Sequence, residues 1–464
     1  MFLGREKELA ELERAYATNT FSFAVVYGRR RVGKSTLLNQ FAHNKRTVFF
    51  TALETDSQGN LSGAGRALSG ITDIPQGTFF SSWNAFFDYV AETAKKEQLV
   101  FIIDEYPYLA RAERGISSLL QQYCDTRFKT SRLMLILCGS SMSFMENQVL
   151  GYKSPLYGRR TLQFHIHPFD YYDSAKFVPS YSFEDKALTY ACTGGIPKYL
   201  ELFKDSLTVK QNILNNFFNS SGYLYEEPQN LLKQELREPS KYNAVIEAIV
   251  NGCSRLNETA TKLSLDTGAV SLYLRSLITL GIVEKVTPVT ENANKKKTLY
   301  RVCDGMFNFW YRYVFGNDFS LVSGTVENLY DNEIQSDLPR FMGSVFEKMC
   351  REYLIRKAVS LPFPVRELGC WWGTNQKSRT EEEIDIVAVN TKLSAVLFGE
   401  CKYRDRQTDM QVYENLVERS QLLPSFKEKY YMLFSKSGFT GTLKKRAAED
   451  TSLQLVTIQD MYTD

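Results

Sequence analysis

The chain has 464 residues and a formal net charge of +3, from 56 basic and 53 acidic side chains. At roughly 100–200 residues per domain, this length predicts two to four domains. A composition of 44% hydrophobic and 23% charged residues excludes a disordered or low-complexity chain, and the near balance of charge excludes a polycation. Any surface for nucleic acid therefore has to be a local patch.

The sequence begins with a charged helical pattern, and no apolar run approaches the roughly 18 residues that a membrane-spanning helix needs. We therefore expect a cytoplasmic protein with no membrane partner. The eight cysteines are scattered without a Cys-x-x-Cys pair, which argues against a zinc ribbon and against a disulfide framework.

The first part of the chain alternates apolar strands with amphipathic helices. Strand-sized apolar runs occupy residues 21–27, 47–51, 99–103 and 133–138, and helical spacing occupies residues 35–42, 83–96 and 116–127. Continuous apolar strands separated by helices are typical of a parallel sheet with helices on both faces. The first part therefore predicts a doubly covered α/β domain.

The pattern changes after residue 180. Helical spacing over residues 183–233 precedes three short helices at 241–252, 255–264 and 267–281 and two strands at 282–289 and 298–302. The polar loop between these strands ends in Lys295, Lys296 and Lys297. Three helices followed by a basic hairpin predict a winged helix-turn-helix whose wing contacts DNA phosphates.

The last third carries another α/β pattern. Residues 331–339 are polar and predict a linker. The pattern beyond it predicts a helix at 341–358, strands at 365–371, 383–389 and 395–402, a helix at 407–423 and a strand at 430–435. This order favours a second, smaller sheet with its own helices.

Residues 28–35 carry the most specific motif. They read Gly-Arg-Arg-Arg-Val-Gly-Lys-Ser, which fits the pattern G-x-x-x-x-G-K-[ST] between a strand and a helix. There the backbone N–H groups and the helix N-terminus surround phosphate, Lys34 reaches the β- and γ-phosphates, and Ser35 holds Mg²⁺. The motif predicts nucleotide contacts from Gly28, Arg29, Arg30, Arg31, Val32, Gly33, Lys34, Ser35 and Thr36.

Two carboxylates follow the apolar strand at 99–103. We expect Asp104 to hold Mg²⁺ and Glu105 to polarise the attacking water. The alternative is a strand that ends in a solvated acidic turn. The paired carboxylates favour hydrolysis, because the sequence shows no Asn-Lys-x-Asp motif of the kind that reads guanine.

Three further side chains are candidates for the same site. Ser140 follows the strand at 133–138 and would contact the γ-phosphate or the water, or else belong to a helix N-cap before Met142. Arg159 and Arg160 are candidate arginine fingers, which would act within the chain or from a second copy in a homo-oligomer. The alternative for both is a pair of surface arginines at a strand edge.

These motifs, in this order, resemble the archaeal-type ATPases of the AAA+/STAND group over about residues 1–235. The matching segments read FLGREKELAEL, GRRRVGKSTLL, FIIDEYPYL, CGSSMSFM, PLYGRRT and TGGIPKYL. The resemblance implies ATP as the substrate and places Gly4 and Arg5 near the nucleotide base. It also implies a helical lid in which Pro197 packs against the adenine.

A second possible site lies in the C-terminal α/β pattern. Glu400 and Lys402 are two residues apart on one predicted strand, so they share a face, and a neighbouring strand can bring Asp385 beside them. The two carboxylates would hold a second Mg²⁺ or Mn²⁺, and the lysine would act on water or phosphate.

The spacing of these three residues resembles that of PD-(D/E)xK nucleases. That resemblance implies supporting roles for Glu347 on the preceding helix and for Gln411 or Glu414 on the following one. The whole architecture resembles ATPases with a C-terminal nuclease-like domain of the DUF234 type. The alternative is a retired nuclease fold.

The expected fold is α/β in five parts. These are a P-loop ATPase core with a parallel sheet (1–180), a helical lid (181–238), a winged helix-turn-helix (239–305), an aromatic helix with linker (306–340) and a restriction-endonuclease-like domain (341–464). We predict an ATPase coupled to DNA binding, with metal-dependent DNA cleavage as a further activity. The competing hypothesis is a nucleotide-controlled switch with protein partners only.

Overall fold

The structure is a computed structural model that describes residues 2–72, 79–291, 297–376 and 378–463. The chain divides into two compact units, residues 1–168 and 169–464. Within the described residues, no helix combines the length and apolar character needed to cross a membrane. The five-part division stays a prediction, because compactness alone separates only these two units.

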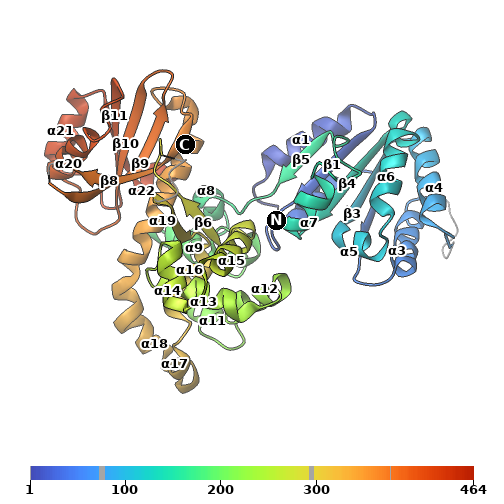
Figure 1. The fold of residues 1–464 in the computed structure, drawn as a ribbon, viewed down its shortest axis with the longest axis horizontal. Helices are drawn as coiled ribbons and strands as arrows, with labels where there is room; N and C mark the ends of the chain where they lie inside the picture. The colour runs from blue at the N-terminus through green and yellow to red at the C-terminus, as the bar shows by residue number, and fades with distance from the viewer. Residues whose placement is uncertain (1, 73–78, 292–296, 377, 464) are drawn as a thin grey trace. The chain divides into compact units, whose positions relative to one another are not determined.

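The N-terminal unit is built on a five-stranded, fully parallel sheet in the order β2-β3-β4-β1-β5 (Figure 1). Its strands are β1 Ser22–Tyr27, β2 Thr47–Thr51, β3 Leu99–Asp104, β4 Leu133–Gly139 and β5 Leu162–His165. Its helices are α1 Glu6–Ala17, α2 Lys34–Ala42, α3 Ser57–Ser69, α4 Trp83–Lys96, α5 Tyr106–Ala112, α6 Ile116–Asp125 and the short α7 Met142–Phe144. This confirms the parallel sheet predicted from the apolar runs.

Both faces of this sheet are buried, as its continuous apolar strands require. Alternate residues such as Phe23, Val25 and Phe101 pack against α3, α4, α5 and α6 in one large apolar core. Helices α1 and α2 pack together, and α2 lies against β3. Because all five strands are parallel, the loops after β1, β3 and β4 leave the sheet at the same edge.

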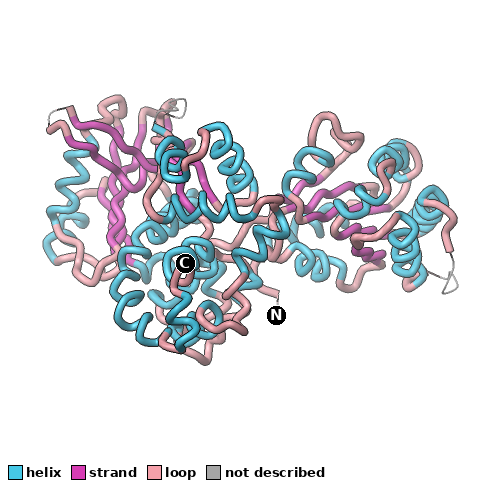
Figure 2. Tube along the Cα trace, turned by 60° about the horizontal axis from the view of Figure 1, so that its bottom comes forward, coloured by secondary structure: helices cyan, strands magenta, loops and turns pink. Residues whose placement is uncertain are grey.

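The C-terminal unit begins with a mostly helical stretch (Figure 2, cyan). It contains α8 Tyr171–Ala175, α9 Phe183–Thr193, α10 Pro197–Leu200, α11 Val209–Phe217, α12 Glu227–Glu235, α13 Pro239–Val250, α14 Leu256–Leu263 and α15 Thr267–Thr279. The antiparallel strands β6 Val283–Val286 and β7 Leu299–Val302 follow. The order α13, α14, α15, β6 and β7 matches the three helices and the hairpin that the sequence predicts.

One predicted linker is wrong. Residues 331–339 are helical: a π-helical turn over Tyr330–Ile334 runs into α19 Gln335–Arg356. Asp337 accepts two hydrogen bonds from the Arg312 guanidinium, at 2.6 and 2.9 Å, and buried Tyr330 and Ile334 anchor the turn. The neighbouring helices are α16 Gly305–Tyr313, α17 Asp318–Ser323 and α18 Val326–Leu329.

The C-terminal sheet is mixed, in the order β12-β11-β10-β9-β8. Its strands are β8 Glu367–Asn375, β9 Thr380–Asn390, β10 Ala395–Lys402, β11 Glu428–Ser435 and β12 Leu453–Thr457, with helices α20 Met410–Ser420, α21 Gly441–Glu449 and α22 Ile458–Tyr462. The β8-β9 and β9-β10 pairs are antiparallel, and the β10-β11 and β11-β12 pairs are parallel. This confirms the separate C-terminal sheet predicted from the sequence.

Candidate functional site

The phosphate-binding loop joins β1 to α2 at the carboxyl edge of the parallel sheet. A Cβ atom at Gly28 would lie 2.3 Å from the Ile166 carbonyl oxygen, so only glycine fits there. Gly33 precedes α2 with φ of 88°, a conformation that costs glycine little. The two glycines let the loop turn tightly in front of the α2 N-terminus, where backbone N–H groups can face an anion.

Lys34 lies inside this loop and is only 6% exposed. Its Nζ donates to the carbonyl oxygens of Gly28 and Arg29, at 2.9 Å each. Burial lowers the pKa of Lys34, and the nearby acidic groups Asp104 and Glu105 oppose that effect. The ammonium group is therefore held in the loop at a desolvation cost that an anionic ligand would offset.

Ser35 and Asp104 meet as the sequence predicts. The Ser35 Oγ donates to Asp104 Oδ2 at 2.8 Å, across 69 residues of sequence. Hydroxyl and carboxylate oxygens are ligands that Mg²⁺ prefers beside substrate phosphates. The residues present therefore fit a Mg²⁺ ion shared with a nucleotide.

Glu105 has an unusual backbone. Its φ of 51° is left-handed, which costs a non-glycine residue about 1–2 kcal/mol. Its carboxylate Oε2 accepts from the Ser140 Oγ at 2.9 Å and more weakly from the Ser140 N–H at 3.4 Å. Strain of this kind gathers at functional sites, and here it turns the carboxylate toward Ser140, at the end of β4.

The N-terminal Gly4-Arg5 pair lies at the same loop. The Arg5 guanidinium donates to the Val32 carbonyl oxygen at 3.2 Å and to the His167 carbonyl oxygen. Arg5 thus links the start of the chain to the phosphate-binding loop. Contact of Gly4 and Arg5 with a nucleotide base stays a prediction, as does the adenine contact of Pro197, the first residue of α10 in the other unit.

The two candidate arginine fingers differ. Arg159 forms a two-pronged ion pair with Asp125 at the end of α6, with both hydrogen bonds at 2.8 Å. The Arg160 side chain makes no hydrogen bond or ion pair with any residue in the described parts of the chain. Arg159 is therefore occupied in this conformation, whereas the Arg160 guanidinium is available to a ligand or to a second copy.

In the C-terminal sheet, the register brings two predicted site carboxylates together. Gly399 pairs with Ile386 in the antiparallel β9-β10 ladder, so the next residues, Glu400 and Asp385, face each other. Lys402 Nζ lies 2.6 Å from Glu400 Oε1. Burial and the neighbouring carboxylates of Glu400 and Glu347 raise the pKa of Asp385 to about 7. We call Glu347, Asp385, Glu400 and Lys402 the carboxylate cluster.

The sequence did not predict that an arginine of α20, Arg419, lies beside the carboxylate cluster. Arg419 on α20 lies 3.2 Å from Glu400 Oε2 and donates to the Glu383 carbonyl oxygen at 2.6 Å. Gln411 instead donates to Asn415 on its own helix, at 2.9 Å. The spacing of Gln411, Asn415 and Arg419 places all three on one helix face, which is a signal that could have identified the arginine.

The carboxylate cluster does not fit a second divalent cation. Glu400 Oε1 accepts from Lys402 at 2.6 Å, and its Oε2 lies 3.2 Å from the Arg419 guanidinium but receives no hydrogen bond within the described residues. Asp385 Oδ2 accepts from the Cys401 N–H at 2.8 Å. Within the described ranges, no group of three or more His, Cys, Asp or Glu side chains is placed to hold a metal ion. Arg419 adds a positive charge where a metal would need a negative one.

The predicted wing is only partly described. Lys295 and Lys296 lie outside the described residues, and Lys297 pairs with Glu291 at 2.7 Å. The hairpin region also contacts the C-terminal sheet: the Val289 N–H donates to the Cys370 carbonyl oxygen at 2.9 Å, and Arg301 donates to Glu383 at 3.2 Å. These contacts fix the base of the hairpin within the C-terminal unit.

Comparisons with known proteins agree with this architecture. Residues 2–203 match a family described as an ATPase domain predominantly from Archaea, and residues 310–413 match the DUF234 family, described as archaeal and bacterial proteins of unknown function. An uncharacterized protein of Methanocaldococcus jannaschii is 34% identical over 443 residues, which cover 94% of this chain and 96% of that protein. An uncharacterized ATP-binding protein of the same organism is 46% identical over 46 residues, 10% of this chain and 78% of that protein.

The fold is similar to that of the Walker-type ATPase of Pyrococcus abyssi. That likeness has a TM-score of 0.52 and 18% identity, and it covers 67% of this chain and 96% of that one. Three findings identify the family. They are the parallel sheet with its phosphate-binding loop, the mixed C-terminal sheet and the relative that matches nearly the whole chain. The chain belongs to the archaeal-type P-loop ATPases that carry a C-terminal DUF234 domain.

Proposed function

We propose that the chain hydrolyses ATP at the phosphate-binding loop and uses the hydrolysis cycle to control DNA binding by its C-terminal unit. The observation that carries the catalytic part is the convergence of Lys34, the Ser35–Asp104 pair and the strained Glu105 at one edge of the sheet. An ATP-binding relative over a short segment supports the choice of nucleotide.

Each residue of this site has a distinct role in the proposal. Lys34 binds the β- and γ-phosphates, and Glu105 accepts a proton from the attacking water. Ser140 orients Glu105 through its 2.9 Å hydrogen bond, so we assign it a positioning role in addition to any contact with phosphate. A Mg²⁺ ion held by Ser35 and Asp104 would neutralise charge on the phosphates.

Arg160 completes the site in this proposal. A guanidinium near the transferring phosphoryl group stabilises its developing charge. Arg160 has no partner within the described residues and is half-buried. It would act within the chain or in a homo-oligomer, from a second copy.

Salt-dependent binding tests the DNA part of the proposal. We expect duplex DNA to bind with an affinity that falls steeply with salt, because cationic side chains release counterions from the phosphates. Replacing Lys295, Lys296 and Lys297 by alanine should reduce the slope of log affinity against log salt by about one for each of these lysines that binds a phosphate. Fluorescence anisotropy over a salt series measures both slopes.

The control for this test is Lys96→Ala, which removes an exposed lysine of the N-terminal unit and changes the charge in the same sense. It should leave the slope unchanged. An unchanged slope in the triple variant would place the DNA surface elsewhere. If the parent protein binds no form of DNA, the DNA part of the proposal is wrong.

One observation favours a second candidate, a switch that binds proteins only. Helix α15 is the third helix before the hairpin, where a DNA-reading helix would lie. Its outer face exposes Leu272 by 59% and Ile278 by 37%, with Arg275 as the one exposed cation of α15. Apolar side chains suit a protein surface better than a phosphate backbone.

The carboxylate cluster gives a separate prediction. Because Glu400 is neutralised by Lys402 and Arg419, we expect no Mn²⁺ binding that depends on Asp385, and no cleavage of duplex, single-stranded or branched DNA. Calorimetric titration of Mn²⁺ into the nucleotide-free parent and into Asp385→Asn should give the same heats. Disappearance of metal binding in Asp385→Asn, together with disappearance of DNA cleavage in Lys402→Ala, would establish an active nuclease instead of a retired one.

A further inference from the structure

A cavity of about 260 Å³ lies inside the C-terminal unit and is built by elements other than those of the phosphate-binding loop. Helices α9, α13, α16 and α19 and the β6-β7 hairpin all contribute to its lining. Five of the lining side chains are charged, four of them positively: Arg301, Arg312, Lys348, Arg351 and the single carboxylate Glu284. An excess of cations in a concave site favours an anionic ligand.

The arginines of the lining differ in how far they are already paired. Arg312 forms a two-pronged pair with Asp337 through its Nε and Nη2 atoms. Arg351 and Arg301 share the Glu347 carboxylate only loosely, at 3.9 and 4.0 Å. Arg351 also makes a long hydrogen bond of 3.5 Å to the Asp385 carbonyl oxygen, and Arg301 reaches Glu383 at 3.2 Å. Two guanidinium groups on one side of the cavity therefore retain donors for a ligand.

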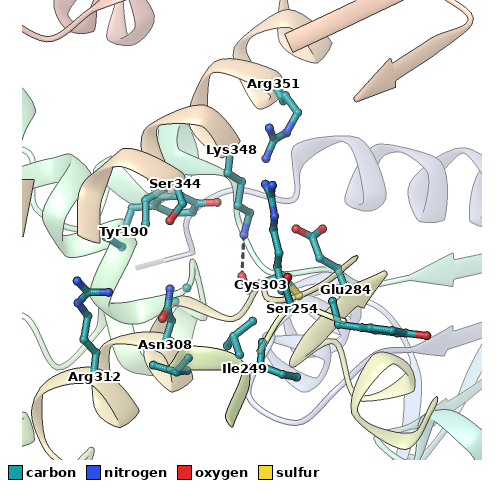
Figure 3. Close-up of a pocket in the computed structure, with 18 residues that line it drawn as sticks. Tyr190, Ile249, Ser254, Glu284, Cys303, Asn308, Arg312, Ser344, Lys348 and Arg351 are labelled. Atoms are coloured by element: carbon teal, nitrogen blue, oxygen red, sulfur yellow. Dashed lines mark hydrogen bonds between the residues drawn. The ribbon is translucent and has the colours of Figure 1, made fainter. Parts of the chain in front are cut away.

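Lys348 has few partners among the described residues of the lining. Its ammonium group has three donors, but there it makes no ion pair and only one long hydrogen bond, 3.4 Å to the Cys303 carbonyl oxygen, beside a cation–π contact 5.4 Å from the centre of the Tyr190 ring. Figure 3 shows Lys348 and Arg351 extending from α19 into the cavity, with the Lys348 amine above Cys303. Glu352, one turn further along α19, accepts hydrogen bonds from the Tyr190 hydroxyl at 2.7 Å and from the Tyr171 N–H at 3.1 Å.

We propose that this cavity binds a small phosphorylated anion, with Lys348 as its main anchor. A compact ammonium and a planar guanidinium such as Arg351 are the pair of groups that proteins use to hold phosphate oxygens. The neutral polar side chains of Asn308 and Ser344 also line the cavity and can bind the remaining oxygens. A volume below the roughly 300 Å³ lower limit of ordinary ligand pockets selects a ligand of the size of a diphosphate or a phosphorylated sugar.

A ligand at this place would connect several parts of the C-terminal unit. Lys348 and Arg351 lie on the same helix as Glu347 of the carboxylate cluster, and Tyr190 belongs to α9, which leads into the Gly194-Gly195 turn before Pro197. The ligand would therefore join α9 to α19. This is a second anion site, independent of ATP hydrolysis at the phosphate-binding loop.

Calorimetric titration with pyrophosphate tests the proposal. The full-length Lys34→Ala variant serves as the background, because it lacks the competing phosphate site of the loop. We expect the Lys34→Ala variant to bind one pyrophosphate per chain. Adding Lys348→Ala should raise the dissociation constant for pyrophosphate about tenfold or more, because a hydrogen bond to a charged group is removed. The matched control is Lys445→Ala, an exposed lysine on α21, which should leave the affinity unchanged.

Circular dichroism and thermal melting establish that each variant is folded. If Lys348→Ala fails to fold, the same titration is made with Lys348→Gln, which keeps most of the alkyl stem and removes the charge. The proposal is overturned if the Lys34→Ala background binds no pyrophosphate, or if its affinity is unchanged by the Lys348 substitution. A loss of duplex DNA affinity in Lys348→Ala without any pyrophosphate binding would overturn it too, and would assign the cavity to the DNA backbone.

Discussion

Replacement of Lys34 by alanine is expected to abolish ATP binding. Lys34 is 6% exposed and its ammonium group is held by two carbonyl oxygens of the loop, so it is already in place when a nucleotide arrives. The variant loses the point charge that faces the β- and γ-phosphates and also the two bonds that hold the loop in shape. We expect the dissociation constant for ATP to rise by about 100-fold or more, because several charge-assisted bonds are removed together.

Isothermal titration with ATP and Mg²⁺ measures this loss. The matched control is Lys96→Ala, which removes an exposed lysine from the end of α4 in the same unit and should leave ATP affinity unchanged. Circular dichroism separates a loss of binding from a loss of fold. A folded Lys34→Ala variant that still binds ATP at micromolar concentration, about −8 kcal/mol, would contradict the assignment of the loop.

The local parts of the fold could be predicted from the sequence. The bounds of β2, α4 and β10 coincide with the predicted segments, because their apolar spacing is regular and their ends carry clear signals. Ser82, for example, caps α4 by accepting a hydrogen bond from the Ala85 N–H. The strand order β2-β3-β4-β1-β5 is not a local property, and it follows only from how the strands pack.

The wrong linker at residues 331–339 shows where local reasoning fails. Polar residues and Pro339 argue against a helix when they are taken alone. The helix forms because Asp337 meets Arg312, which lies 25 residues earlier, and because Tyr330 and Ile334 are buried. Tertiary contacts of this kind override intrinsic helix propensity, and no window of neighbouring residues contains them.

The candidate site likewise has parts that the sequence could predict and parts that depend on tertiary contacts. The phosphate-binding loop could be identified because glycines, lysine and serine follow one another at fixed spacing, and the sheet then brings Ser35 to Asp104. The helical spacing of Gln411 and Arg419 places both on one face of α20, but the ion pair between Arg419 and Glu400 forms only when α20 packs beside β10. A short motif therefore identified the carboxylates, and their surroundings determine whether they can bind a metal.

The change Glu105→Gln is expected to separate ATP binding from ATP hydrolysis. The amide keeps the shape of the side chain and can still accept a hydrogen bond from Ser140, so the strained backbone at Glu105 should persist. It cannot take a proton from water. We expect turnover to fall about 10²–10⁴-fold, as for the loss of a general base, while the affinity for ATP changes little.

Steady-state phosphate release and equilibrium ATP titration measure the two properties in the same preparation. The matched control is Glu113→Gln at the end of α5, where the carboxylate also accepts a hydrogen bond from a serine, Ser57, at 2.8 Å. That variant should hydrolyse ATP at the parent rate. If Glu105→Gln also keeps the parent rate, another group polarises the water, and the left-handed backbone at Glu105 has to be explained by its hydrogen bond to Ser140 alone.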